Sequence, residues 1–257
     1  MKKIISWNVN GIRACAKKGM FDFLSKEKPD IFAIQEIKAN YDQVNSLSLG
    51  GHPQGYDVVM FPAQKPGYSG VGVYVKKGIE YDVEKGLGIK EFDNEGRSLT
   101  LLMKEMVFVV AYFPNSQAER ARLSYKLAFC KEMKKYLDSF TKKGKPVLLC
   151  GDYNIAHKEI DLTHPESNED SPGYYPEERA WMDEFIDSGY IDTFRMFNKE
   201  GNNYTWWSYR TAARTRNVGW RIDYHCVNKY LKSNVVKSYH NPDVMGSDHC
   251  PVTVIIS

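Results

Sequence analysis

The amino-acid sequence predicts an α/β fold in which two β-sheets are stacked face to face and covered by helices on their outer faces. Two observations lead to this prediction. About ten short runs of β-branched or apolar residues recur along the chain, with turn-forming residues between them. Few stretches have the spacing of an amphipathic helix, so sheets must supply most of the core.

The length and composition fit one folded domain. The chain has 257 residues, of which 42% are hydrophobic and 13% aromatic, which is enough for a packed core and excludes disordered and fibrous proteins. Residues 163–175 are rich in Pro, Ser, Gly and acidic residues, but they have the length of a surface loop rather than a linker. We therefore expect a single domain over residues 1–257.

The predicted strands follow the apolar runs. Some runs alternate apolar and polar residues, as in strands with one exposed face, and others are continuously apolar, as in strands buried on both faces. The predicted strands are residues 3–9, 31–35, 58–61, 71–75, 99–103, 107–113, 147–150, 221–227, 235–239 and 252–256.

Helices are predicted at four places between the strands. The longest begins at Ser116, which forms an S-x-x-E capping box with Glu119, and ends at residues 142–144. Its apolar residues at helical spacing are Ala121, Tyr125, Ala128, Met133, Leu137 and Phe140. A second helix is predicted over residues 176–187, because Pro176 suits a first helical turn. Shorter helices fit residues 20–27 and 42–47.

The sequence favours a cytoplasmic, monomeric protein with no membrane role. Its longest apolar run, residues 107–113, is far shorter than the ~20 residues of a membrane-spanning helix. The first residues fit a strand better than a signal peptide. The five cysteines are scattered without a C-x-x-C pair, which fits reduced thiols.

Several common catalytic motifs are absent from the sequence. It contains no Walker A, H-E-x-x-H or G-x-G-x-x-G motif, which excludes the usual nucleotide hydrolases, zinc proteases and dinucleotide-binding enzymes. The stretch GYSG at residues 67–70 is one residue short of a nucleophile elbow. We interpret it as a tight turn that leads into a strand.

Polar residues with catalytic side chains gather where the predicted strands end. They are Asn8, Asn10, Glu36, Asp152, Asn154, Asp223, Asp248 and His249. Each alone has an ordinary structural explanation as a turn former, a helix cap or part of a surface hydrogen-bond network. Together they provide hard oxygen ligands, a general-base carboxylate and an imidazole beside an acid, and strand ends can bring them to one edge. This set suits metal-assisted hydrolysis of a phosphate ester.

The net charge of +3 is too small to indicate a nucleic-acid binder, but one segment is locally basic. Residues 201–220 contain Arg210, Arg214 and Arg216 and no acidic residue. The same segment contains five aromatic residues: Tyr204, Trp206, Trp207, Tyr209 and Trp220. Basic side chains bind phosphates and aromatic rings stack on bases or sugars, so this segment is a candidate DNA-binding surface. The alternative is a buried tryptophan pair with solvated arginines.

Seven motifs in order along the chain resemble the exonuclease III class of abasic-site endonucleases. They are ISWNVNG (5–11), QEIK (35–38), GYSGV (67–71), YFPN (112–115), CGDYNIAH (150–157), VGWRIDY (218–224) and SDHCP (247–251). The match covers nearly the whole chain. It implies the four-layer α/β sandwich of the deoxyribonuclease I superfamily, with two mixed sheets between layers of helices.

The resemblance also implies a function. It indicates a Mg²⁺-dependent nuclease, with Mn²⁺ as an alternative ion, that cuts double-stranded DNA on the 5′ side of an abasic site and leaves a 3′-hydroxyl. A 3′-to-5′ exonuclease or 3′-phosphodiesterase activity is expected beside it. The alternatives are a phosphodiesterase of the same fold acting on an inositol phosphate or a lipid, an endonuclease directed at uracil, and a catalytically inactive DNA-binding module.

The same resemblance assigns roles to the residues at the strand ends. Glu36 is implied as the main carboxylate ligand of the metal, with Asn8, Asn10 and Asp248 nearby. Asp152 is implied as the base that activates water. The implied partners of Asp152 are Asn154, which holds the water, His249, oriented by Asp223, and the phosphate-binding Tyr112 and Asn115.

A pocket for the flipped abasic nucleotide is implied as well. Trp206, Trp220 and Ile222 line it by resemblance, Arg210 presses into the minor groove, and Trp207 faces the core. Weaker candidates for contacts to the DNA backbone are Tyr68, Arg97, Arg122 and Lys126. His157 and His164 are expected to be structural, because neither has a second ligand at metal spacing.

Two departures from the family pattern stand out. Asn10 stands where some members have Asp, which argues against a tight second metal site. Residues 164–170 (HPESNED) are acidic where relatives often have Lys and Asn, and acidic side chains there would repel phosphate.

Overall fold

The computed structural model describes residues 1–45 and 53–257, without the side chains of Asn45 and Thr211. The strands are β1 (Lys2–Asn8), β2 (Ile31–Gln35), β3 (Tyr56–Phe61), β4 (Val71–Lys76), β5 (Asp82–Lys85), β6 (Ser98–Leu102), β7 (Val107–Tyr112), β8 (Val147–Asp152), β9 (Tyr190–Asp192), β10 (Asp223–Asn228), β11 (Val235–His240) and β12 (Val252–Ile256). The α-helices are α1 (Ile12–Ala16), α2 (Met20–Glu27), α3 (Tyr41–Asn45), α4 (Lys90–Asp93), α5 (Leu123–Thr141), α6 (Pro176–Asp187) and α7 (Thr193–Phe197).

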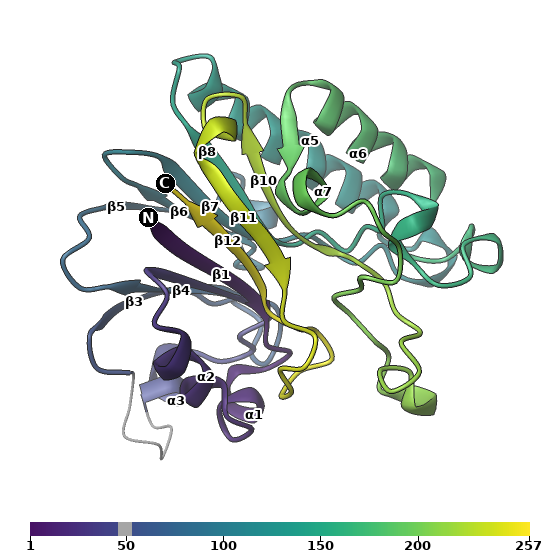
Figure 1. Ribbon diagram of the computed structural model, residues 1–257, viewed down its shortest axis with the longest axis horizontal. Coiled ribbons are helices and arrows are strands. Elements are labelled where there is room, and N and C mark those ends of the chain that lie inside the picture. The colour runs from purple at the N-terminus through teal and green to yellow at the C-terminus, as the bar shows by residue number, and fades with distance from the viewer. Residues whose placement is uncertain (46–52) are drawn as a thin grey trace.

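Two mixed sheets form the middle of the molecule (Figure 1). The first has the strand order β11-β12-β1-β2-β4-β3 and the second β5-β6-β7-β8-β10-β9. Each has one parallel pair at its centre, β1 with β2 and β7 with β8, flanked by antiparallel neighbours. Because β1 pairs with both β2 and β12, the two ends of the described chain contribute to the same sheet.

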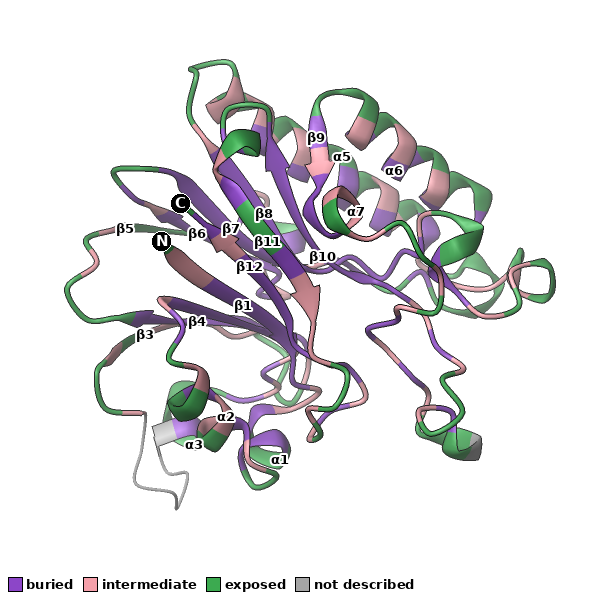
Figure 2. Ribbon diagram, viewed as in Figure 1, coloured by how far each residue is buried: buried purple, intermediate pink, exposed green. Residues whose placement is uncertain are grey.

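Alternating apolar side chains hold the layers together. On the inner faces, Ile4 and Ala33 of the first sheet share a core with Val110 and Leu148 of the second. The outer face of the first sheet packs against α1, α2 and α3, and that of the second against α5 and α6. The central strands are buried along most of their length (Figure 2). These layers confirm the predicted stack of two mixed sheets between helices.

Most predicted elements lie where the sequence places them. Both α2 and α6 have the predicted bounds, and Pro176 occupies the first turn of α6. Strands β2 and β12 also match the prediction residue for residue. The helix expected at residues 42–47 is represented by α3, and residues 46 and 47 lie outside the described part of the chain.

The predicted start of the long helix is wrong. Helix α5 begins at Leu123, seven residues after Ser116, and a 3₁₀ turn at Ala118–Arg120 precedes it. Glu119 has a φ of 55°, which a right-handed helix does not allow. The Ser116 hydroxyl instead donates to Glu178 Oε1 at 2.8 Å. A long-range partner therefore replaces the expected capping box.

Five short elements are not predicted by the sequence. Strand β5 is charged and exposed, β9 has three residues, and α1, α4 and α7 have four or five each. Elements this short carry too few periodic positions to be recognised. All five cysteines are buried and free. Within the described residues, no helix is long and apolar enough to cross a membrane.

Candidate active site

The strand register brings the predicted catalytic residues to one edge of the molecule. Asn8 is the last residue of β1, and Glu36 follows directly after its parallel neighbour β2. In the second sheet, Asp152 ends β8 and pairs with Tyr112 of β7 on one side and Asp223 of β10 on the other. The central strands of both sheets therefore deliver their carboxyl ends to the same place.

Asp223, His249 and Asp152 form a line of buried groups. His249 Nδ1 lies 2.8 Å from Asp223 Oδ2, and His249 Nε2 lies 3.8 Å from Asp152 Oδ2. Burial disfavours the charged imidazole, but the carboxylates of Asp223 and Asp152 outweigh it and raise the pKa of His249. Burial raises the pKa of Asp152, and Asp223 and Glu36 add to this rise against the opposing charge of His249.

Amide groups fix the orientation of the Asp152 carboxylate. The backbone N–H of Asn154 donates to Oδ1 at 2.7 Å, and Asn8 Nδ2 donates to Oδ2 at 2.8 Å. Asn154 has a φ of 51°, and this turn directs its N–H back at the carboxylate. Its side chain donates to the carbonyl of Phe113 at 2.9 Å and accepts from Asn115 Nδ2 at 3.2 Å. Asn154 and Asn115 thus lie together at the base of the site.

Glu36 and Asp152 offer carboxylate oxygens that could hold a metal ion, with His249 beside them. One ligand atom of each lies within 4.8 Å of the others. Asn8 Nδ2 donates to Glu36 Oε1 at 2.9 Å as well as to Asp152, so one amide holds both carboxylates. The chemistry of this donor set fits a divalent cation. Burial and the nearby Glu36 raise the pKa of Tyr112, whose hydroxyl stays protonated and able to donate.

Asn10 and Asp248, predicted to lie near the metal, have other partners. Asn10 Nδ2 donates to Asp248 Oδ1 at 2.9 Å, and Asn10 Oδ1 accepts from Lys38 Nζ at 2.5 Å. Asp248 Oδ2 accepts from Trp206 Nε1 at 3.1 Å. Lys38, which the sequence analysis does not assign, also lies 2.7 Å from a carboxylate oxygen of Glu36. Metal ligation by Asn10 or Asp248 stays a prediction.

A cavity of about 500 Å³ opens beside these groups. Trp206, Trp220 and Ile222 line it, with the two indole rings edge to face and their centroids 6.3 Å apart. Trp206 also pairs by its backbone with His249, which ties this wall to the catalytic residues. The geometry therefore brings together the three residues that the resemblance places in a nucleotide pocket.

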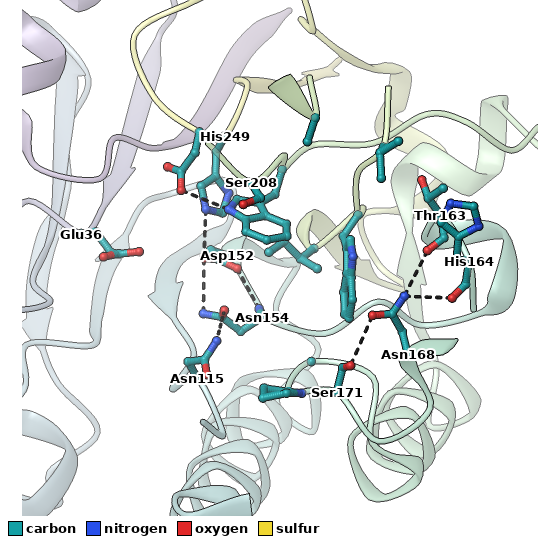
Figure 3. Close-up of a pocket in the computed structure, with 18 of the residues that line it drawn as sticks. Glu36, Asn115, Asp152, Asn154, Thr163, His164, Asn168, Ser171, Ser208 and His249 are labelled. Atoms are coloured by element: carbon teal, nitrogen blue, oxygen red, sulfur yellow. Dashed lines mark hydrogen bonds and ion pairs between the residues drawn. The ribbon is translucent and has the colours of Figure 1, made fainter. Parts of the chain in front are cut away.

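Other parts of the cavity wall are polar, and two of their residues, His164 and Asn168, have no site role in the sequence-based prediction. Figure 3 shows Asp152, Asn154 and His249 between Glu36 at one end and His164 and Asn168 at the other. Asn168 Nδ2 donates to the carbonyl of His164 at 2.8 Å. His164 thus lines the cavity, and its expected structural role stays a prediction. The acidic composition of residues 164–170 marks this loop in the sequence, but it does not show which of its side chains face the cavity.

The basic segment 201–220 divides into buried and exposed parts. Trp207 is buried as predicted, and the guanidinium of Arg214 lies 4.6 Å from its ring centroid. Arg214 donates to the carbonyls of Ser247, Pro242 and Val244, so its guanidinium joins this segment to the loop before β12. Arg210 is exposed at the end of the arm that projects from the sheets, coloured yellow-green in Figure 1.

The weaker candidates for backbone contacts fall into two groups. Arg97 and Lys126 are buried, so the expectation that they contact DNA is wrong. Arg97 and Arg122 both donate to the hydroxyl of Tyr68, at 3.0 and 2.7 Å. Tyr68 and Arg122 remain partly exposed. His157 pairs with Asp183 at 2.7 Å, an interaction that fits a structural histidine.

Comparison with known proteins gives consistent matches. The sequence profile of the endonuclease/exonuclease/phosphatase family matches residues 5–249. An exodeoxyribonuclease from Bacillus subtilis is 41% identical over 257 residues, which cover 99% of each chain. A DNA-(apurinic or apyrimidinic site) endonuclease from Dictyostelium discoideum is 39% identical over 259 residues, covering 99% of this chain and 70% of that one. The crystal structure of an AP endonuclease from Leishmania major superposes with a TM-score of 0.90 at 32% identity, covering 99% of this chain and 87% of that one.

Proposed function

The chain belongs to the endonuclease/exonuclease/phosphatase family, and we propose that it hydrolyses the phosphodiester on the 5′ side of an abasic site in double-stranded DNA, leaving a 3′-hydroxyl. The observation that carries this proposal is the line Asp223–His249–Asp152 beside a cavity walled by two tryptophans. The relatives support the substrate, because one is named an exodeoxyribonuclease and another an apurinic or apyrimidinic site endonuclease.

Asp152 is the group that takes the proton from the attacking water. Water is a poor nucleophile toward an anionic phosphodiester, so hydrolysis needs a base held in line with the scissile bond. The raised pKa of Asp152 makes it a stronger base than an exposed carboxylate. The side chain of Asn154 lies beside it and holds the water against the base.

His249 stabilises the charge that develops on the phosphate. Its raised pKa keeps the imidazole protonated, and the contact to Asp223 directs Nε2 toward Asp152 and the cavity. A fixed, buried cation at this position favours the more negative transition state over the ground state. The Tyr112 hydroxyl and the Asn115 amide border the same cavity and add neutral donors.

Glu36 is the residue best placed to hold a divalent cation, and we propose Mg²⁺, with Mn²⁺ as a substitute. Its carboxylate borders the cavity next to Asp152 and His249, and Asn8 orients it. When bound, the ion neutralises phosphate charge and polarises the phosphorus–oxygen bonds. Asn10 and Asp248 support this edge through their contacts to Lys38 and Trp206.

The cavity selects the lesion. Trp206, Trp220 and Ile222 offer an apolar wall for a deoxyribose without a base. A nucleotide that lacks its base loses little stacking or pairing energy when it is flipped out of the duplex, so abasic sites enter most easily. Arg210 on the projecting arm and Tyr68, whose hydroxyl accepts from Arg122, are proposed to contact the DNA backbone.

Activity at 3′ ends is a second expected reaction of the same site. The Bacillus subtilis relative is named an exodeoxyribonuclease, and a frayed 3′ end would present the same phosphodiester to Asp152 and His249. We expect the protein to act on DNA as a monomer in the cytoplasm.

The decisive experiment is incision of end-labelled duplexes that carry an abasic site, a uracil or a normal base. Each duplex is incubated with Mg²⁺, with Mn²⁺ and with chelator. We expect a single metal-dependent cut at the abasic site, and a product that a DNA polymerase extends without further processing, because its end is a 3′-hydroxyl.

Two results would contradict the proposal. One is the absence of a metal-dependent cut at the abasic site. The other is faster hydrolysis of an inositol phosphate or a phospholipid than of the abasic duplex, which would favour a different substrate for the same fold.

A further inference from the structure

One buried carboxylate joins three segments that border the active site. Glu178 lies in the first turn of α6, and both its side chain and that of Lys126 on α5 are 0% exposed. Glu178 Oε1 accepts from Lys126 Nζ at 2.6 Å and from the Ser116 hydroxyl at 2.8 Å. Oε2 accepts from the backbone N–H groups of Gly173 and Tyr175 at 2.8 and 2.9 Å. Four donors from separate parts of the chain thus converge on Glu178.

Three of these donors are adjacent to residues of the active site or belong to its wall. Ser116 follows Asn115, which borders the cavity. Gly173 is itself part of the cavity wall. Lys126 Nζ makes a second hydrogen bond, at 2.6 Å, to the backbone carbonyl of Asn154. The ion pair therefore lies immediately behind the residue that orients the Asp152 carboxylate.

Helix capping does not account for Lys126. Glu178 already closes the first turn of α6 through the N–H of Tyr175, and this hydrogen bond needs no cation. Burying two charges is costly, and apolar replacements of buried ion pairs are often as stable as the originals. The second hydrogen bond of Lys126 indicates what the pair does, because it ends on Asn154.

The carbonyl of Asn154 is held tightly. A side chain at Gly173 would place its Cβ 2.9 Å from this oxygen, and Gly173 has a φ of 93° that favours glycine. Asn154 itself has a positive φ, while its N–H holds Asp152 Oδ1. The carbonyl and the N–H of Asn154 belong to successive peptide groups that meet at its Cα, so a displacement of the carbonyl that shifts this Cα also shifts the amide contacts to Asp152.

We propose that the Lys126–Glu178 pair is a positioning device that fixes Asn154 and, through it, the Asp152 carboxylate for attack on the phosphodiester. This inference rests on the proposed function. Displacing a catalytic group by a fraction of an ångström lowers the rate of the chemical step more than the affinity for substrate. The pair should therefore control turnover and leave DNA binding nearly unchanged.

The test uses the double variant Lys126→Met/Glu178→Gln in the full chain. The glutamine amide introduced at position 178 can still accept from the N–H groups of Gly173 and Tyr175 and can donate to Ser116. No buried charge then remains, and the interactions removed are the ion pair itself and the hydrogen bond from Lys126 to the Asn154 carbonyl. Lys126→Met alone is a second variant, in which Glu178 keeps three donors. The matched control is Lys134→Met/Asp138→Asn, which removes a partly exposed ion pair from the same helix α5.

Three quantities are measured for each variant: the single-turnover incision rate with Mg²⁺, the Kd for an abasic duplex in chelator, and the unfolding temperature. Incision is measured at a temperature where every variant is fully folded. We expect the rate to fall by about 10- to 100-fold in both Lys126 variants, with a Kd close to that of the unaltered protein. The control pair should change neither quantity by more than about two-fold.

Two outcomes would overturn the inference. One is a double variant that is folded and cuts at the rate of the unaltered protein. The other is a loss that appears entirely in Kd, because the pair would then shape the DNA surface and not the reacting groups. If the unaltered protein itself does not cut abasic DNA, the proposed function fails instead.

Discussion

Asp152 receives its orientation from neutral amides and its basicity from its surroundings. Asn8 and the N–H of Asn154 hold its two oxygens, and no lysine or arginine contact to it is present among the described residues. Burial can then raise the pKa of Asp152 without an adjacent permanent cation to reverse the effect. His249 is the charged partner, 3.8 Å away, and Asp223 compensates it on its far side. At the scale of single residues, the base and the stabilising cation are therefore two different side chains, Asp152 and His249.

Replacing Asp152 tests this separation directly. Asp152→Asn keeps the size of the side chain and most of its contacts but removes the proton acceptor. We expect turnover to fall by about 10²-fold or more, the usual scale for loss of a general base. The measurement is single-turnover incision of an abasic duplex in Mg²⁺. Because the amide does not disturb the cavity, the Kd for the duplex in chelator should be retained, and near-normal turnover would remove Asp152 from this role.

At the scale of elements, the loop between β8 and α6 combines a cavity wall with an acidic surface. Asn168 and Ser171 face the cavity, whereas Glu169 and Asp170 between them are exposed. Arg120 contacts Asp170 and Glu177, an exposed arrangement that neutralises little of this charge in water. DNA that enters the cavity therefore passes close to two exposed carboxylates, of which Asp170 has a solvent-exposed partner in Arg120.

Neutralising these carboxylates should strengthen DNA binding. For Glu169→Asn/Asp170→Asn we expect the affinity for an abasic duplex to rise several-fold at low salt, because repulsion from the phosphates is removed. The gain should disappear as the salt concentration rises. The control is Glu105→Asn. Glu105 precedes the first residue of β7, whereas Tyr112 at the cavity is the last residue of that strand. A gain that persists at high salt would show that the loop acts through its shape and not its charge.

Strand β10 carries a buried histidine that makes stability depend on pH. Burial lowers the pKa of His225 to about 3, and its Nε2 has no hydrogen-bond partner among the described residues. In the unfolded chain a histidine has a pKa of about 6.5, so below that pH the unfolded state binds a proton that the folded state excludes. The stability contributed by neutral His225 is therefore fully present above pH 6.5 and is lost as the pH falls toward 3.

This dependence can be measured by urea unfolding at a series of pH values. His225 should contribute up to about 1.4 kcal/mol per pH unit to the slope of the unfolding free energy below pH 6.5. In His225→Gln the slope should become shallower by that amount. The same substitution at the exposed His164 should leave the slope unchanged. An equal slope in the His225 variant and the unaltered protein would contradict the assignment.

The sequence predicted helix bounds correctly where the local pattern is strong. It failed where a contact with a residue distant in the chain determines where the helix begins. The bounds of α2 and α6 follow from apolar spacing and from Pro176, both of which are local. The start of α5 depends on Ser116, whose hydroxyl could cap a helix but binds Glu178, 62 residues further along the chain. A capping box in the sequence cannot show that competition.

At the scale of the whole molecule, the small net charge of +3 conceals an uneven distribution. Arg210 lies on the projecting arm, while Arg214 in the same segment is used inside the fold and Arg97 is buried beneath Tyr68. Two of these three arginines therefore serve the fold, and Arg210 is the one exposed on the arm. Because each phosphate that is neutralised adds about one unit to the slope of log Kd against log salt, this slope counts the cations that contact DNA.

Arg210→Ala tests this distribution. We expect weaker binding to abasic and undamaged duplexes alike, and a slope of log Kd against log salt that is smaller by about one unit, because one phosphate is no longer neutralised. The matched variant Arg214→Ala should instead lower the unfolding temperature, because three backbone carbonyls lose their donor. If Arg210→Ala weakened binding only to abasic DNA, we would conclude that Arg210 recognises the abasic site and does not contact the DNA backbone.

The sequence by itself determined the two-sheet fold, the family and the set of residues at the strand ends, because these depend on local periodicity and on short motifs. It could not determine which side chains contact one another across the fold. Only the tertiary structure places Lys126 in a buried pair with Glu178, turns His164 and Asn168 toward the cavity, and ties Asp248 to Trp206. The reason is physical: each of these contacts joins segments that are remote in the chain, and their geometry exists only once both sheets have packed and their central strands end at one edge.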